Sequence, residues 1–412
     1  MTAEPLAALP TARTCPYAPR EEHVRLQEQD PVSRATLPSG SDAWVVTRHA
    51  DVRTVLSDPR FSSDSSRPGY PRLGVRDEAG DETAGEAGGG IEQVFPRLMI
   101  SLDAPEHGIA RRAVLSEFTH RRLAGLKPRI QEIVDEHIDA MLAGPRPVDL
   151  VQALALPVPS LVISELLGVP YADHAFFQER SSLILKRGAR PEETQQAMLE
   201  LAGYLDSLLQ AKEQEPTDDL LGRQILRQRE ATGTVDRADL VGLSFLLLTA
   251  GHETTANMIT LGTLKLTEDP AAHEAIRQDP DKTPPAVEEM LRYFTIAEQV
   301  LARAATDDVE LGGKLIKAGD GVLTLSHVGN RDPEVFEDPD VFDVERGARN
   351  HLAFGYGAHQ CLGQNLARLE LQVVFDTLLR RIPGIRPAVP VEELPFKEDS
   401  LVYGIHEFPV TW

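Results

Sequence analysis

Long stretches of helical periodicity constrain this chain more than any other feature of its sequence. Apolar residues recur at intervals of three and four in five stretches, at residues 122–143, 149–167, 191–213, 236–267 and 361–380. Such spacing places them on one face of an α-helix. Shorter runs with the character of strands lie near the two ends, at residues 43–47, 401–404 and 408–412. The pattern predicts a mainly α fold with small β-sheets.

Composition and charge limit what these helices can build. The chain has 412 residues, of which 42% are hydrophobic, enough to bury a sizeable core. Because no stretch marks a division, we expect one domain spanning residues 1–412. The formal net charge of −22 argues against non-specific binding of nucleic acid, since most of the surface would repel phosphates.

Targeting and membrane signals are not expected in this sequence. Residues 1–10 have neither the basic nor the apolar region of a signal peptide. The longest apolar run, residues 243–251, is far shorter than the roughly 20 residues that cross a bilayer. Two cysteines, Cys15 and Cys361, are too few for a disulfide framework. We therefore expect a cytoplasmic protein without a membrane anchor.

Two segments lack the periodicity of a helix or strand. Residues 77–90 are acidic and glycine-rich, with almost no large apolar side chain, so we expect a mobile loop that can act as a lid. In residues 331–350, Pro333 and Pro339 each follow an aspartate, which favours irregular turns.

Positive charge is concentrated between residues 107 and 129. One acidic residue, Glu117, stands there against six basic residues, for a local net charge of +5: Arg111, Arg112, Arg121, Arg122, Lys127 and Arg129. We call residues 107–129 the basic segment. It is compatible both with solvated helix surface and with a receiving site for an acidic partner.

Cys361 ends a glycine-rich run and directly precedes a strongly amphipathic stretch. Its sulfur is therefore expected at a helix N-terminus, where free N–H groups and the helix dipole favour the thiolate, a good iron ligand. Gly355, Gly357 and Gly363 allow a tight turn and the close approach of a flat macrocycle. A lone cysteine is more often a small buried hydrophobe. A dinucleotide-binding loop would need a third glycine in this run.

The residues around Cys361 match a known motif, namely Phe354, Gly357, Cys361, Gly363, Leu366, Ala367 and Arg368. Through them the chain resembles the cytochrome P450 superfamily, in which such a cysteine holds the haem iron and Phe354 and Gly355 would lie beside the haem. The resemblance covers nearly the whole chain and is closest to soluble actinomycete enzymes that hydroxylate macrolides, secosteroids and other natural products. It implies a triangular prism with haem b, iron protoporphyrin IX, between the long helix 236–267 and the Cys361 helix.

A second match lies in the long helix, at Ala250-Gly-His-Glu-Thr-Thr255. The resemblance implies that Ala250 and Gly251 make room for dioxygen above the iron, and that Glu253 and Thr254 relay protons to it. Thr254 can bond back to the carbonyl of Ala250, which opens the helix locally. A zinc-protease interpretation fails because Ala256 stands where the second histidine would be.

A third match is the pair Glu289 and Arg292, three residues apart on one helix face. Alone, such a pair is a weak surface ion pair. The resemblance implies that it joins Arg346 and locks the segment ahead of the haem loop.

Groups for the haem propionates come from three parts of the sequence. His107 and Arg111 are four residues apart and share a helix face. The resemblance implies that both bind the propionates, together with Arg303 and His359.

The implied reaction is hydroxylation or epoxidation of an apolar small molecule with dioxygen and two electrons. No stretch resembles a flavin or iron–sulfur module, so NAD(P)H would deliver electrons indirectly, through a ferredoxin reductase and a ferredoxin that docks near Arg112. The expected substrate pocket is mostly apolar and contains Leu247, Leu248, Ala250, Ile296, Val300, Leu401 and Val402.

Two other functions suit a haem-binding chain, a haem-thiolate enzyme that uses peroxide and a haem-binding sensor without catalysis. Neither depends on the pair Glu253 and Thr254, because proton relay is needed chiefly for dioxygen activation. The presence of this pair favours the monooxygenase.

Overall fold

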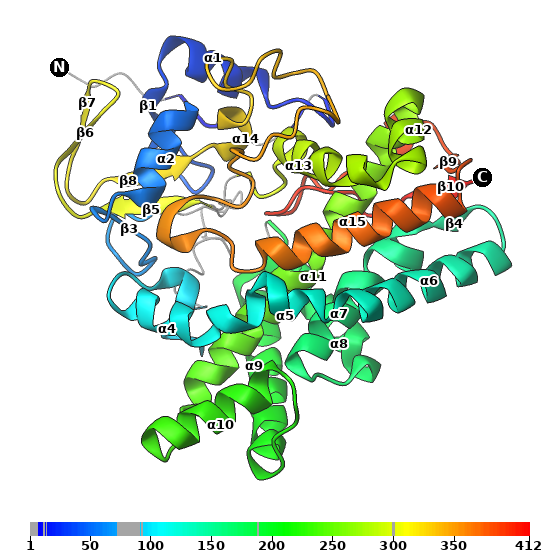
Figure 1. Ribbon diagram of the computed structural model, residues 1–412. Helices are drawn as coiled ribbons and strands as arrows, with labels where there is room; N and C mark the ends of the chain where they lie inside the picture. Colours follow the sequence, from blue (N-terminus) through cyan, green and yellow to red (C-terminus); the bar gives the residue numbers. More distant parts are fainter. Residues whose placement is uncertain are drawn as a thin grey trace.

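Figure 1 shows the computed structural model, which describes residues 7–10, 13, 15–71, 91, 94–187, 189–298 and 301–412. The fold is built mainly from α-helices. The described ones are α1 (Glu21–Gln29), α2 (His49–Ser57), α4 (Glu106–Leu115), α5 (His120–Ala124), α6 (Lys127–Ala143), α7 (Pro157–Leu167), α8 (His174–Leu185), α9 (Pro191–Gln214), α10 (Leu220–Thr232), α11 (Arg237–Glu268), α12 (Pro270–Gln278), α13 (Thr283–Phe294), α14 (Ser326–Gly329) and α15 (Gln364–Arg381).

The strands form small sheets. The largest has the order β1 (Val32–Thr36), β2 (Asp42–Val46), β8 (Gly321–Thr324), β5 (Ala302–Ala305) and β3 (Phe61–Ser62). Only the β2–β8 pairing in it is parallel. A second sheet joins β4 (Val148–Asp149), β10 (Pro409–Thr411) and β9 (Arg386–Pro387), and a hairpin joins β6 (Val309–Leu311) and β7 (Lys314–Ile316).

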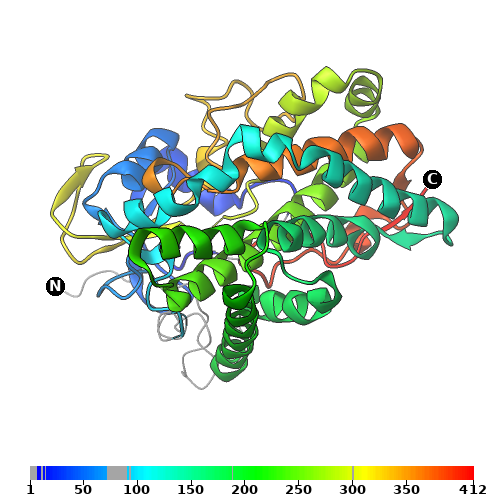
Figure 2. The same ribbon diagram turned by 60° about the horizontal axis from the view of Figure 1, so that its bottom comes forward.

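The elements divide the molecule into a sheet-rich end and a helix-rich end. The five-stranded sheet lies with α1 and α2 beside the N-terminus, whereas α12, the end of α15 and the C-terminus lie at the other end (Figures 1 and 2). In Figure 1 the molecule is widest between these two ends and becomes narrower towards α9 and α10 at the bottom of the view. A mainly α fold with small sheets, as the sequence predicts, is confirmed.

Helix α11 is the central element. The side chain of Asp236 caps its N-terminus by accepting the backbone N–H of Asp239 at 3.1 Å. Buried residues occur on all of its faces, and α7, α9 and α15 pack against it. A helix that is apolar all round is a core helix. No helix in the described part of the chain is long and apolar enough to cross a membrane.

Several expected boundaries move in the structure. The stretch 122–143 breaks at Gly125 into α5 and α6, and 149–167 opens with a π-helical turn, Val151–Ala155, before α7. Strands β2 and β10 confirm those expected at 43–47 and 408–412, and residues 331–350 form only turns and bends. The loop expected at 77–90 lies outside the described residues.

The strand expected at 401–404 is wrong. The backbone N–H of Leu401 donates to Leu185, and that of Tyr403 donates to Ile296. These hydrogen bonds go to two different segments, so no continuous ladder forms.

A buried histidine pair joins α1 to α14. His23 Nδ1 lies 3.1 Å from His327 Nε2, and His23 Nε2 lies 3.1 Å from the Pro10 carbonyl oxygen. Burial lowers the pKa of His23 to about 3, and burial next to His23 also lowers the pKa of His327 well below its ordinary value. Both rings are therefore neutral in the folded protein.

We expect acid to destabilise the fold through this pair. Below about pH 6.5 the two histidines bind protons in the unfolded chain but not in the folded one, so the free energy of unfolding falls as the pH falls towards 3. Above pH 6.5 both states are neutral at these residues, and the pair makes no pH-dependent contribution. The slope is about 1.4 kcal/mol per pH unit and per histidine. Urea unfolding at pH 7 and pH 5 measures it, with His23→Gln as the comparison. An equal pH slope in both proteins would contradict the assignment.

Candidate active site

A large cavity lies between α11 and the segment that carries Cys361. Its volume is about 320 Å³, within the roughly 300–1,000 Å³ of a usual small-molecule site. Three groups of residues line it: Met99, Ile100, His107, Arg111, Phe118 and Ile163; Leu246, Leu247, Ala250, Gly251, Thr254, Thr255 and Met258 of α11; and Leu291, Ile296, Ala297, Leu301, Ala353, Phe354, Gly355, His359, Cys361, Leu362, Gly363, Leu366, Ala367, Glu370 and Leu371. Most of these side chains are apolar.

Cys361 is held by a tight loop at the wall of this cavity. Its backbone N–H donates to the Phe354 carbonyl at 2.8 Å. Gly355 and Gly357 have φ of 68° and 74°, in the left-handed region that favours glycine. A Cβ on Gly357 would lie 2.4 Å from the carbonyl oxygen of Leu56 in α2. The glycines therefore let the loop turn and pack closely against α2.

The Cys361 thiol has an environment that the sequence describes only in part. Helix α15 begins at Gln364, so Cys361 lies three residues before the helix and not at its start, where the stretch 361–380 predicted it. Burial raises the pKa of Cys361, while the N–H groups of Gly363 and Gln364 and the charge of Arg111 lower it. The N–H groups favour the thiolate, as expected, but burial has the larger effect. Coordination to a metal deprotonates a thiol outright.

Helix α11 forms the wall that carries the second motif. The Thr254 hydroxyl donates to the Ala250 carbonyl at 2.8 Å, as expected, and both residues line the cavity with Gly251. A Cβ on Gly251 would lie 3.0 Å from Ile163 Cγ1 in α7, which explains the small residue. Thr254 thus presents its side chain to the same cavity as Cys361.

Glu253 does not line the cavity with Thr254. Its carboxylate accepts a hydrogen bond from Lys397 at 2.9 Å, and both side chains are 9% exposed. The sequence placed Glu253 next to Thr254 in a relay. In the structure Thr254 faces the cavity while Glu253 is in a buried ion pair.

Basic and imidazole groups gather at one edge of the cavity. The rings of His107 and His359 stack with centroids 3.8 Å apart, and Arg111 donates to the Gln360 carbonyl at 2.6 Å. Burial, with the charges of Arg111 and Arg303, lowers the pKa of His107, and burial beside His107 lowers that of His359 to about 3. Arg303 is 5% exposed. Of the four expected groups, His107, Arg111 and His359 line the cavity, and Arg303 is not in its described wall but is close enough for its charge to act on both histidines.

An ion-pair cluster fixes the segment ahead of the Cys361 loop. Arg292 contacts Glu289 at 2.7 and 2.8 Å, and Arg346 contacts Glu289 at 3.3 Å. The predicted contacts among these three are confirmed. Arg292 also donates to backbone carbonyls of Asn330, Pro339 and Val341, so it ties the irregular segment to α13.

Sequence reasoning missed a second cluster beside the first. Glu288 accepts hydrogen bonds from Arg368 of α15 at 2.5 and 3.0 Å and contacts His351 at 3.1 Å. Burial opposes ionisation, but these partners lower the pKa of Glu288 to about 2. Arg368 is part of the Cys361 motif, and this ionic contact accounts for its presence.

The expected substrate-pocket residues divide into two groups. Leu247, Ala250 and Ile296 line the cavity. Leu248 is fully buried in the core, because consecutive residues of a helix point about 100° apart and Leu247 already faces the cavity. Val402 is also packed in the core. Leu401 lines a different cavity. Val300 lies outside the described residues. Leu246 also lines the cavity but was not predicted. Its four-residue spacing from Ala250, which is in turn four residues before Thr254, places it on the same helix face and could have indicated it.

The residues present fit a haem. A thiol at one wall can hold the iron, and a Cβ added to Gly363 would meet no atom of the described residues within 4 Å, which leaves space for a flat ring. Arg111 and two imidazoles at one edge, with the charge of Arg303 nearby, match two propionate carboxylates in charge and hydrogen bonding. The mostly apolar remainder suits the body of the macrocycle and an apolar ligand beside it.

Comparison with known proteins agrees with this geometry. The family described as Cytochrome P450 matches residues 175–383. Vitamin D3 dihydroxylase from Streptomyces griseolus is 45% identical over 409 residues, which cover 98% of this chain and 97% of that protein.

Solved structures extend the similarity to the fold. Cytochrome P450 MoxA from Nonomuraea recticatena is 56% identical with a TM-score of 0.89, covering 98% of both chains. Mycinamicin VIII C21 methyl hydroxylase MycCI from Micromonospora griseorubida, bound to mycinamicin VIII, is 41% identical with a TM-score of 0.90, covering 99% of this chain and 100% of that one. With these relatives and the Cys361 loop, the chain belongs to the cytochrome P450 family and is a haem-thiolate monooxygenase.

Proposed function

We propose that this monooxygenase hydroxylates or epoxidises a large apolar natural product, of the macrolide or steroid-like class, using dioxygen and two electrons from a ferredoxin. The observation that carries the proposal is the cavity wall, which is mostly aliphatic and contains both Cys361 and Thr254. Apolar walls favour an apolar substrate. The names of the relatives that act on vitamin D3 and mycinamicin VIII support the size and class.

Haem b would be held by groups already in place. Cys361 would bind the iron, and Arg111, Arg303, His107 and His359 would bind the propionates. When bound, the haem supplies the reductive activation of dioxygen. The polypeptide positions the substrate and excludes bulk water, and Thr254 supplies a hydroxyl on the substrate side.

The first experiment is a carbon monoxide difference spectrum of the reduced protein, followed by titration of macrolides and secosteroids against the haem spin state. We expect a strongly red-shifted Soret band and a spin-state change with large apolar ligands. An unshifted, histidine-type band would contradict the assignment of Cys361. A spin-state response confined to small polar ligands would contradict the substrate class.

Replacing Thr254 tests oxygen activation. In Thr254→Ala the proton-donating hydroxyl is lost, so we expect product formation to fall ~10²-fold or more, while oxygen uptake continues and hydrogen peroxide accumulates. Thr260→Ala is the control, because Thr260 also bonds to a carbonyl of α11 but does not line the cavity. Equal product yields from all three proteins would favour peroxide-driven catalysis, and a chain without turnover would favour a haem-binding sensor.

The basic segment supports docking of an acidic ferredoxin. Arg122 pairs with Glu117, and Arg129 pairs with Glu165. Arg112 and Arg121 are exposed and form no ion pair with the described residues. Arg111 contacts the Cys361 loop through Gln360, so a partner bound to α4 would lie close to the iron ligand.

Charge reversal at Arg112 tests this docking surface. We expect Arg112→Glu to slow reduction by ferredoxin several-fold, most strongly at low salt, without changing substrate binding. Arg386→Glu is the control, because Arg386 is exposed on β9, at the other end of the molecule in Figure 1. Unchanged stopped-flow reduction rates in Arg112→Glu would exclude this face.

A further inference from the structure

The one ion pair of Glu253 among the described residues connects the oxygen-activation motif to the C-terminal part of the chain. Lys397 Nζ lies 2.9 Å from Glu253 Oε2, and the two residues are separated by 144 positions in the sequence. Both side chains are 9% exposed. A carboxylate at such a depth is strongly stabilised by a cation in contact with it and strongly destabilised without it.

The position of Lys397 is fixed by its own loop. The Lys397 N–H donates to the Gly404 carbonyl at 2.8 Å, and the Tyr403 N–H donates to the Ile296 carbonyl at 3.0 Å. A Cβ on Gly404 would lie 2.1 Å from Asn257 Oδ1 of α11, so the loop lies directly against that helix. Because Ile296 lines the large cavity, the loop that carries Lys397 is attached to a substrate-facing segment.

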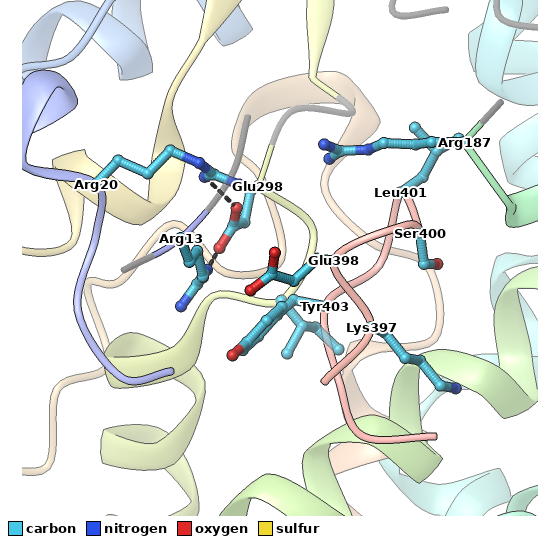
Figure 3. Close-up of a pocket in the computed structure, with 10 residues that line it drawn as sticks. Arg13, Arg20, Arg187, Glu298, Lys397, Glu398, Ser400, Leu401 and Tyr403 are labelled. Carbon is cyan, nitrogen blue, oxygen red and sulfur yellow. Dashed lines mark hydrogen bonds and ion pairs between the residues drawn. The ribbon is translucent and has the colours of Figure 1, made fainter. Parts of the chain in front are cut away.

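A second, small polar cavity of about 10 Å³ lies beside this loop (Figure 3). In Figure 3 the Lys397 side chain extends away from the other labelled side chains, and its ammonium points towards α11, where it contacts Glu253. His252 is the titratable neighbour of Glu253 on α11 itself. The remaining charged and titratable groups around the cavity are Arg13, Arg20, Arg187, Glu298, Glu398 and Tyr403.

Among the described residues, Lys397 is the cation that contacts Glu253, because the neighbouring charged groups have other partners. Arg20 contacts Glu298 at 2.8 Å, and Arg13 also pairs with Glu298. His252 bonds to the Leu248 carbonyl at 2.7 Å and is neutral, because burial lowers its pKa. No second cation contacts Glu253 within the residues that the structure describes.

We propose that Lys397 is a positioning residue that holds the Glu253 carboxylate away from Thr254, so that the acid can serve the relay only when this ion pair opens. The inference rests on the proposed function. On opening, the Glu253 carboxylate takes a proton from solvent hydronium and passes it to the Thr254 hydroxyl oxygen, while Thr254 releases its own proton into the cavity. One proton thus moves from solvent to the cavity, and Glu253 returns to its carboxylate form. Movement of the Ile296 segment, through the loop, provides a route by which bound substrate favours opening.

Four variants of the haem-loaded enzyme test the proposal: Lys397→Met, Lys397→Arg, Glu253→Gln and the double variant Lys397→Met/Glu253→Gln. Lys212→Met is the matched control, because Lys212 forms a comparably buried ion pair with Asp219, with both side chains 8% exposed. Asp219 caps α10 and is not in the cavity wall. Two measurements are made, infrared difference spectra of carboxyl groups and the pH profile of product formed per oxygen consumed.

We expect Lys397→Met to leave Glu253 buried without a counter-charge, which favours its protonated form at neutral pH. A carboxylic acid band should appear that is absent from the wild type and from the double variant. The pH profile of coupling should move to higher pH by about one unit or more, and Lys397→Arg should restore it. Lys212→Met should leave both measurements unchanged.

Two results would overturn the proposal. One is the absence of a Glu253-dependent infrared band in Lys397→Met, and the other is an unchanged pH profile in that variant. The infrared measurement needs no turnover, so it stands even if no natural product is hydroxylated. Failure of the proposed substrate class and failure of the Lys397 proposal are therefore distinguishable.

Discussion

Replacing Cys361 with serine is expected to abolish the red-shifted Soret band of the reduced, carbon monoxide-bound protein and to bring product formation below detection. A hydroxyl has nearly the size of a thiol, so the loop should keep its shape. The axial ligand, however, loses the electron density that a thiolate gives the iron. Absorbance spectra and product assays of the purified variant measure both effects.

The chain offers a matched control for this substitution. Cys15 is its other cysteine, it is free and partly buried, and it does not line the large cavity. Cys15→Ser should therefore keep the band and the activity. A Cys361→Ser protein that retained the red-shifted band would show that another residue ligates the iron, and the assignment of the site would be wrong.

The sequence predicted best where one local pattern determines one local structure. Helix α11 follows from uninterrupted periodicity and matches the expected stretch 236–267 to within one residue at each end. The bond from Thr254 to the Ala250 carbonyl follows from four-residue spacing alone. The Cys361 loop follows from its glycines, two of which adopt positive φ.

Prediction failed where the outcome depends on contacts between distant segments. Nothing near Glu253 in the sequence indicates Lys397, because the tertiary fold brings the two together. Leu401 and Val402 have the composition of a pocket wall or a strand, yet backbone bonds to α8 and to the Ile296 segment place them elsewhere. The pKa of the Cys361 thiol likewise depends on burial, which no local motif reveals.

The cluster around Arg292 shows how both kinds of information combine. Its spacing from Glu289 predicts contact on a helix face, for which a surface pair would contribute only a few tenths of a kcal/mol. In the structure both side chains are fully buried, with 0% exposure, and the guanidinium also donates to the backbone carbonyls of Asn330, Pro339 and Val341. Burial changes the expected energetic weight by an order of magnitude.

Arg346 provides the comparison within the same cluster. It contacts Glu289 at 3.3 Å, but its side chain is 15% exposed and its other contacts are to backbone carbonyls near the surface. Solvent can replace part of these contacts in Arg346→Ala. We expect that variant to lose about 1 kcal/mol of unfolding free energy.

Arg292→Ala is expected to lose about 3–5 kcal/mol, because it leaves the Glu289 carboxylate buried without its closest cation and leaves the carbonyls of Asn330 and Pro339 without their donor. Arg292→Lys should recover only part of the loss, since an ammonium cannot form the two parallel bonds of a guanidinium. Urea unfolding should show the largest loss of unfolding free energy in Arg292→Ala, a smaller loss in Arg292→Lys and the smallest loss in Arg346→Ala. Since the segment from Asn330 leads into the Cys361 loop, we expect Arg292→Ala to retain the least haem and Arg346→Ala the most. Equal losses for Arg292→Ala and Arg346→Ala would mean that the buried bonds to α13 do not hold this loop.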